Sequence, residues 1–335
     1  MAEARTREDV AIQLKGDPAR PGDVVPRHFL TVLGDNELPS NADVSGREQL
    51  AEWILAAENP LRACDGQPNL ATSFWTRPGA DLNDFGRQGK PPTHPELLDY
   101  LAAQFRTNGW SIKSMHRRIM LSRSYQQSAA RDPSAILQDP ANEWLAGFSR
   151  RRLDAESIRD TLLVLGGNLD LSPAGAHPFP PQHSWDFTQH KPFKAIYESN
   201  HRSIYLMTQR IQRHPFLAIF DGADPSTSTA ARMISTTPLQ ALYLLNDPFV
   251  HEQSRGVAER IMTHSSDTAS RVTFACELLF ARPPESEERA SAEDFLINAR
   301  RLLQDDGVED EEVDAEAWRA VVRSLLRLNE FVYLD

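Results

Sequence analysis

The stretch from residue 176 to residue 251 constrains the fold most, because it interrupts a chain that otherwise carries helical patterns. It gathers proline, histidine, arginine and aromatic residues in clusters and has no amphipathic repeat. A long segment without regular structure needs side-chain partners for its backbone groups, which accounts for its many polar residues. The sequence therefore predicts a long irregular centre.

Helix-starting signals lie on both sides of this centre. Ser45 is predicted to cap a helix over 45–57, and residues 93–96 read as a capping box for a helix through Phe105. Ser111 caps a further helix that carries Ile112, Met115, Ile119 and Met120 inward. Another helix is predicted over 154–165. A helix is also predicted to begin at Thr237 and to break at residues 246–248, and a further one to follow through Met262. The last three are predicted over 268–280, 286–303 and 315–329.

Residues 15–39 read as irregular, and residues 203–207 are the best candidate for a strand. The sequence therefore predicts a mainly α fold, with a long irregular central segment and at most minor β structure. Residues 1–44 are expected to form an irregular junction segment and residues 45–335 one domain.

The composition argues against several classes of protein. A net charge of −11 does not fit a nucleic-acid binder, whose surface is usually basic. No apolar run reaches the roughly 18 residues that a membrane-spanning helix needs. Cys64 and Cys276 give neither a disulfide framework nor metal-ligand spacing. The first residues lack the apolar core of a signal peptide, so the chain as written is expected in the cytoplasm.

Several long segments, in the same order, resemble one family. They are KGDPARPGDVVPRHFL (15–30), NDFGRQGKPPTHPELLDYLAAQF (83–105), GWSIKSMHRRIMLSRSYQQS (109–128), RRRLDAESIRDTLL (150–163), most of the central segment, and the closing LNEFVYLD. Together they resemble a planctomycete family known as domain of unknown function 1553. The resemblance implies an extracytoplasmic location for the relatives and an upstream region with a signal peptide and often a cytochrome-c-like, haem-binding domain. By that comparison this chain is N-terminally truncated, and haem belongs only to the missing region.

The resemblance stops between residues 63 and 83 and then returns in register. Codons can be chosen for residues 65–81 that, read one nucleotide later, spell MVNRIWQHHFGRGLVR, which is similar to the helix of the relatives. We hypothesise that two compensating frameshifts, near Cys64 and near Leu82, produced the present segment. A gene sequence without this overlapping reading would refute the hypothesis.

Histidines in the central segment are candidate metal ligands, because neutral imidazole is the commonest protein ligand of metals. The candidates are His177, His183 and His190, with carboxylates such as Asp186 nearby. No pair has a diagnostic spacing, so structural histidines that hydrogen-bond to the backbone remain the alternative.

A second constellation consists of Tyr197, Arg202, Tyr205 and Arg210, with His190 as a further candidate. Arginines among aromatic rings can bind carboxylates, sulfate or sugars through bidentate hydrogen bonds and stacking. The alternative is an ion-pair lattice with Asp221 and Asp224 that holds the irregular segment in place.

Two functions stay open from the sequence. The first is a binding or interaction module of a larger extracytoplasmic protein. The resemblance implies that the partner of this module is the missing N-terminal domain or a polysaccharide. The second is a redox-linked or hydrolytic enzyme domain with its site near His190, Tyr197 and Arg202. The sequence carries no P-loop, dinucleotide-binding, nucleophile-elbow or haem-attachment motif, so no cofactor is evident in this portion.

Overall fold

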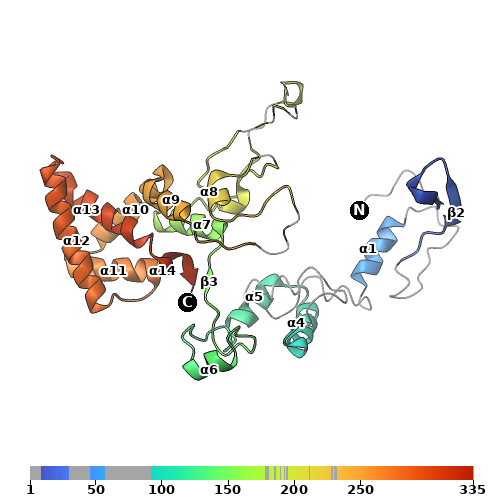
Figure 1. Ribbon diagram of the computed structural model, residues 1–335, viewed down its shortest axis with the longest axis horizontal. Coiled ribbons are helices and arrows are strands. Elements are labelled where there is room, and N and C mark those ends of the chain that lie inside the picture. The colour runs from blue at the N-terminus through green and yellow to red at the C-terminus, as the bar shows by residue number, and fades with distance from the viewer. Residues whose placement is uncertain are drawn as a thin grey trace. The chain divides into compact units, whose positions relative to one another are not determined.

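The structure is a computed structural model that describes residues 9–29, 46–56, 92–177, 181–184, 186–188, 190–191, 193, 195–210, 212–227, 229 and 232–334. The chain divides into two compact units, Met1–Ser149 and Arg150–Asp335. The segment 65–81, for which we hypothesise a frameshift, lies outside the described residues. The prediction of a mainly α fold is confirmed (Figure 1).

The N-terminal unit begins with an antiparallel hairpin of β1 (Val10–Gln13) and β2 (Pro21–Val25), joined through the 3-10 turn η1 (Leu14–Gly16). Part of the segment predicted to be irregular is therefore a strand. Helix α1 (Arg47–Leu55) follows, and its N-cap is Gly46. The ring of Phe29 stacks on Trp53 of α1 with 5.1 Å between centroids.

Three further helices of this unit are α4 (Pro95–Thr107), α5 (Ile112–Met120) and α6 (Pro133–Gln138). The predicted cap of α5 is confirmed, since the Ser111 side chain accepts a hydrogen bond from the Ser114 amide. The predicted capping box at α4 is wrong, because the helix begins at Pro95, which makes His94 the N-cap residue.

The small core of this unit contains Leu101 and Phe105 of α4 and Met115 and Ile119 of α5. The prediction that Ile112 and Met120 also point inward is wrong, since they are 53% and 46% exposed. Met115 and Ile119 stand four residues apart and share the one face that packs against α4, whereas Met120 is turned away by one helical step.

The C-terminal unit contains most of the helices (Figure 1). They are α7 (Ala155–Leu165), α8 (Pro215–Ile219), α9 (Pro238–Asn246), α10 (Pro248–His264), α11 (Thr268–Phe280), α12 (Ser286–Asp305), α13 (Asp310–Leu325) and α14 (Asn329–Val332). Strand β3 (Arg151–Arg152) pairs with β4 (Tyr333–Leu334), so the two ends of the unit meet.

Local signals explain where these helices start. Asp154 accepts from the Ser157 amide at the start of α7, and Thr237 and Gln240 form a reciprocal capping box at the start of α9. Gly166 and Gly167 end α7 as predicted, and Gly167 has a φ of +75°, where a side chain would be strained.

The core of the C-terminal unit is apolar and receives side chains from all of its helices, α7 to α14, with the most extensive contacts between α10, α12 and α13. Its largest member, Trp318, is fully buried, as are Ile261 and Leu296. Helices α7 and α10 approach closely at a glycine contact, because a Cβ atom on Gly256 would lie 2.1 Å from the carbonyl oxygen of Gly166. This contact brings the end of α7, and the segment that leaves it, against α10.

The name central segment is used from here on for residues 166–237, which lie between α7 and α9. This segment is mostly irregular, as predicted, whereas residues 238–251 of the stretch considered above belong to α9 and α10. It contains the 3-10 helices η3 (Gln182–Ser184) and η4 (Ser203–Tyr205) and the short α8. The predicted strand over residues 203–207 is wrong. The Ser203 amide is hydrogen-bonded at 2.7 Å to the Asp160 side chain on α7, so it is not available to a β-ladder.

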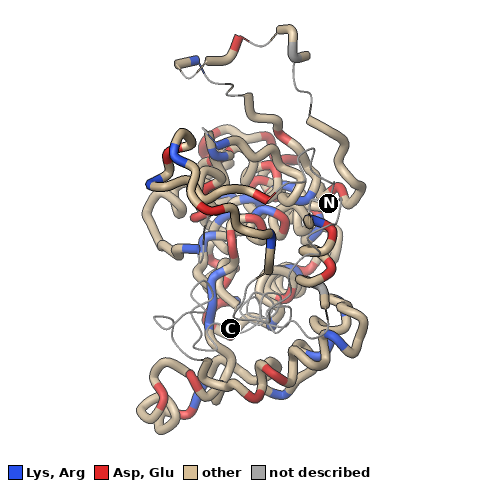
Figure 2. Tube along the Cα trace, turned by 90° about the vertical axis from the view of Figure 1, so that its right-hand side faces the viewer, with Lys and Arg blue, Asp and Glu red and all other residues tan. Residues whose placement is uncertain are grey.

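Both acidic and basic residues are scattered along the trace (Figure 2). Among the residues that the structure describes, no helix is both long and apolar enough to cross a membrane.

Candidate functional site

A buried arginine on α7 holds the central segment in place. Arg159 is only 2% exposed, and its guanidinium donates to the carbonyl oxygens of Ser199 and His201. It also lies 3.3 Å from the hydroxyl of Ser203 and stacks over the Phe249 ring at 5.4 Å. Guanidinium groups have five donors in a fixed plane, so one side chain can satisfy several carbonyls of an irregular backbone.

The imidazole of His201 lies between a serine, to which it is hydrogen-bonded, and the carboxylate of Asp170. Its Nδ1 lies 3.0 Å from Ser199 Oγ, and its Nε2 lies 3.3 Å from Asp170 Oδ2. Ser172 Oγ is a second neighbour of Nε2, at 3.4 Å. Asp170 and His201 are also joined by an isolated parallel bridge, which fixes the two backbones relative to each other. The arrangement has the order serine, imidazole, carboxylate that acyl-transfer enzymes use.

A row of aromatic rings lies in the same central segment as His201. His177 stacks on Tyr197 at 6.0 Å, Tyr197 lies 6.5 Å from Phe193, and Phe193 meets Phe187 edge to face at 4.9 Å. Tyr197 and Phe193 are neither fully buried nor fully exposed. Such half-exposed rings provide flat apolar faces that a ligand ring can stack on.

Next to Tyr197 lies a small enclosed cavity, which we call the central cavity. Its space is about 10 Å³, the size of one water molecule or one hydroxyl group. The residues that line it are Ile196, Tyr197, Met207, Gln209, Gln212 and His214.

Some residues that line the central cavity carry buried polar atoms that have no hydrogen-bond partner among the described residues. These atoms are both ring nitrogens of His214 and the Oε1 atom of Gln212. Burial lowers the pKa of His214, and the positive charge of Arg159 lowers it further, although Glu198 acts in the opposite direction. The ring is therefore neutral at pH 7, with one nitrogen as donor and the other as acceptor. An unpaired buried polar group lowers the stability of the folded state by about 1–3 kcal/mol, so a ligand that hydrogen-bonds to these atoms would recover this free energy.

Asp221 organises the far end of the central segment. Its carboxylate accepts from Arg152 at 2.8 Å, from the amide of Ser235 at 3.0 Å and from the side chain of Gln240 at 3.2 Å. Burial raises the pKa of Asp221, but the hydrogen bonds from the hydroxyl and amide of Ser235 and from Arg152, together with the charge of Arg152, outweigh it, so the pKa is lowered. Asp224 forms a separate ion pair with Arg213. Asp221 and Asp224 are thus both in ion pairs, as the alternative from the sequence supposed, but their ion-pair partners are Arg152 and Arg213, whereas Arg202 lies near Asp160.

The residues predicted to bind a ligand lie at different places in the segment. Tyr197 lines the central cavity. Arg202 is exposed and lies 3.8 Å from Asp160, and the Tyr205 ring meets His201 edge to face at 6.4 Å. His190 and Arg210 are exposed. The structure thus joins Tyr197 to His177 and places Arg202 and Tyr205 beside His201.

The predicted metal ligands His177, His183 and His190 do not form a group of ligating side chains. In the part of the chain that the structure describes, no three or more His, Cys, Asp or Glu residues lie close enough together to hold a metal ion. A metal at these histidines stays a prediction.

Sequence reasoning missed Arg159, Asp170 and Ser199 as members of the site. Arg159 carried a usable signal, because it occupies the same helical stripe as the apolar Ala155, Ile158 and Leu162. A charged residue on a buried stripe indicates an internal partner. Asp170 and Ser199 carried no such signal, since only the fold brings them to His201.

Comparison with known proteins gives a family and no activity. No curated protein and no solved structure matches the chain. Residues 46–296, well over half of the chain, match the model of a family described as PSD1, protein of unknown function (DUF1553). The chain therefore belongs to the DUF1553 family.

Proposed function

We propose that the chain is a binding module of a larger extracytoplasmic protein and that its central segment takes a polyhydroxylated ligand, such as a polysaccharide. The observation that carries the proposal is the central cavity with its unpaired buried groups on His214 and Gln212. A neutral imidazole and an amide oxygen together offer one donor and two acceptors. A hydroxyl group, which donates and accepts, complements this set better than a carboxylate or an ammonium group does.

The neighbouring rings support the same ligand class. A sugar presents an apolar face of C–H groups and a rim of hydroxyls, so it can stack on Tyr197 and His177 while one hydroxyl enters the central cavity. The volume of about 10 Å³ admits a single hydroxyl and no larger group. Recognition would thus depend on one hydroxyl and one ring face.

Calorimetric titration with neutral oligosaccharides from a panel of plant and algal polysaccharides tests the proposal. We expect Tyr197→Ala to weaken binding about tenfold or more, equal to about 1.4 kcal/mol. Trp144→Ala is the matched control, because Trp144 is an aromatic residue that is 68% exposed and belongs to the other unit. Equal binding by the Tyr197 variant and the unchanged protein would refute the site.

A second candidate function is hydrolysis, and the arrangement of Ser199, His201 and Asp170 favours it. With the ring proton of His201 on Nε2, which lies 3.3 Å from Asp170, the Nδ1 atom can accept the hydroxyl proton as Ser199 attacks an acyl carbon. The proton would then pass to the leaving group, and water would release the acyl group from Ser199.

Turnover of a chromogenic acetyl ester separates this candidate from simple binding. Hydrolytic function predicts a rate above background that Ser199→Ala abolishes and Ser172→Ala retains. A rate that is unchanged in Ser199→Ala removes the candidate and leaves the binding proposal untouched.

A further inference from the structure

A second cavity lies in the helical part of the C-terminal unit, which we call the bundle pocket. It is lined by residues of α11, α12 and α13 and has a volume of about 420 Å³. This volume falls within the range of about 300–1,000 Å³ that is typical of small-molecule sites. The pocket uses no residue of the central segment, so it is a separate site.

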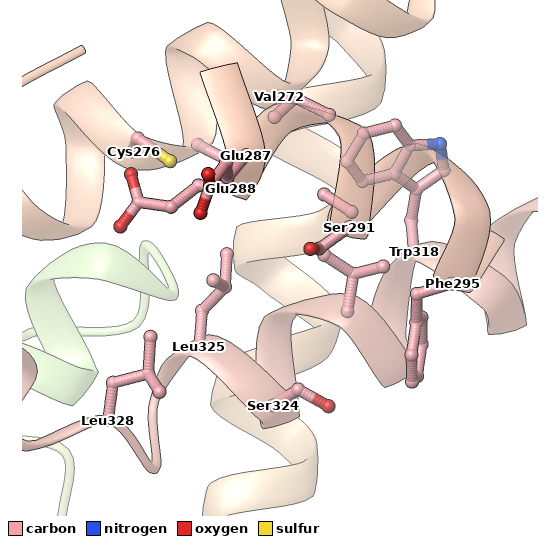
Figure 3. A pocket seen from close by; sticks show the side chains of 13 residues that line it. Val272, Cys276, Glu287, Glu288, Ser291, Phe295, Trp318, Ser324, Leu325 and Leu328 are labelled. Carbon is pink, nitrogen blue, oxygen red and sulfur yellow. The ribbon is translucent and has the colours of Figure 1, made fainter. Parts of the chain in front are cut away.

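Most of the wall of the bundle pocket is apolar. Val272 and Ala275 contribute from α11, Ala292 from α12, and Val321 and Leu325 from α13. In Figure 3, Phe295 and Ser324 lie on the opposite side of the lining from Cys276. Apolar surface of this kind favours a ligand that leaves water with a hydrocarbon body.

The charged residues that line the bundle pocket are both acidic. Glu287 and Glu288 stand next to each other near the start of α12, at the end nearest Cys276 (Figure 3). Arg282 lies beside the pocket and forms ion pairs with both Glu288 and Glu330, so one guanidinium serves two carboxylates. These three groups carry one net negative charge.

Glu287 adds a further negative charge at this end, and it is exposed. The nearby Arg289 directs its guanidinium to the Thr273 hydroxyl on α11 and does not line the pocket. Glu287, Glu288 and Glu330 with Arg282 carry two net negative charges, so this end of the pocket repels an anionic ligand and attracts a cationic one.

We propose that the bundle pocket binds a small organic amine, whose hydrocarbon body lies between α11, α12 and α13 and whose ammonium group faces Glu287 and Glu288. The charge complementarity of the two carboxylates selects this ligand over a fatty acid of equal length. The pocket volume selects a small molecule over a folded partner. This site is independent of the proposed function of the central segment.

Binding of n-octylammonium to the full chain, measured by calorimetry, tests the proposal, with octanoate and n-octanol as probes of equal length. We expect octylammonium to bind most tightly and octanoate at least about tenfold more weakly. Octanoate binding as tightly as octylammonium would overturn the proposal, and so would the absence of octylammonium binding.

Two variants locate the ligand. Glu287→Gln removes a charge without touching the Arg282 ion pairs and should weaken octylammonium binding about threefold to fivefold, as expected for an exposed charge. Glu293→Gln is the matched control on the same helix, since Glu293 does not line the pocket. Ala292→Phe should fill the pocket and abolish binding of all three probes. Binding that survives Ala292→Phe, or that falls equally in both glutamine variants, would place the ligand elsewhere and overturn the proposal.

Discussion

The helices α10–α13 and the central segment of the same unit are stabilised by different means. The helices bury apolar side chains such as Trp318, Ile261 and Leu296 against one another. The central segment contributes Phe216 and Phe220 to the same core, but its irregular backbone is held by the buried guanidinium groups of Arg159 and Arg152, which bind backbone carbonyls and a carboxylate. The difference indicates a division of labour, in which regular helices form a scaffold and polar contacts hold an irregular surface in one defined conformation.

Removal of the largest core side chain should have the largest effect. Trp318 is fully buried in the helical core. Trp318→Ala should lower the free energy of unfolding by about 3–5 kcal/mol, through lost burial and the cavity that remains. Urea unfolding followed by circular dichroism measures the loss. A change below about 1 kcal/mol would mean that the helices do not form one cooperative core.

Removal of the central guanidinium should act locally. Arg159→Met keeps most of the side-chain volume but leaves the carbonyls of Ser199 and His201 without their donor, at a cost of about 3 kcal/mol. Amide hydrogen exchange should accelerate in residues 195–210 while α10 and α13 stay protected. Arg232→Met is the control, because the ion pair of Arg232 with Glu156 is at the surface. Uniform acceleration in all helices would break the proposed division between scaffold and surface.

One added methyl group at the contact between Gly256 of α10 and Gly166 at the end of α7 should lower the stability of the protein. Gly256→Ala would place a Cβ atom 2.1 Å from the Gly166 carbonyl oxygen, so α7 and α10 must move apart. We expect a loss of about 1–3 kcal/mol in unfolding free energy. Gly307→Ala serves for comparison, because nothing lies near its Cβ position and its positive φ alone is strained. A smaller loss for Gly256→Ala than for Gly307→Ala would contradict the close approach.

The smallest change in unfolding free energy is expected on acidification, which should weaken the ion pairs of Arg282. The hydrogen bond and charge of Arg282 lower the pKa of Glu288 from its ordinary value of 4.5 to about 2. Because the pKa is lower in the folded state, the stabilisation is present above the ordinary pKa and is lost as pH falls from 4.5 towards 2. Since Glu288 is partly exposed, solvent screening limits the effect to about 1 kcal/mol or less. The difference in unfolding free energy between the unchanged protein and Glu288→Gln should vanish towards the acid end. A difference that is independent of pH would refute the ion pair.

The sequence predicted the regular part of this molecule well and the candidate site only in part. The predicted cap at Ser111 is confirmed, and the helices predicted to start at Asp154 and Thr237 do have these residues as their N-caps. These signals are local, because each hydrogen bond joins residues three positions apart. The predicted strand over residues 203–207 failed because the decisive contact comes from Asp160, which is 43 positions away.

The same limit applies to the site. Tyr197 was predicted from its aromatic and arginine neighbours, and it does line the central cavity. His214 was not among the candidates from the sequence, since its burial depends on the folding of the whole segment. Arg159 could have been found from its place on an apolar helical stripe, whereas the carbonyls that it binds could not.

The most direct measurement is a comparison of stability and ligand binding in His214→Leu. If the central cavity is a binding site, this substitution removes unpaired buried nitrogens and should leave the unfolding free energy unchanged or higher, while oligosaccharide binding is lost. If His214 is only structural, the substitution should lower stability and leave binding as it was. That second result would contradict the proposal that the central segment keeps its polar groups unpaired for a ligand.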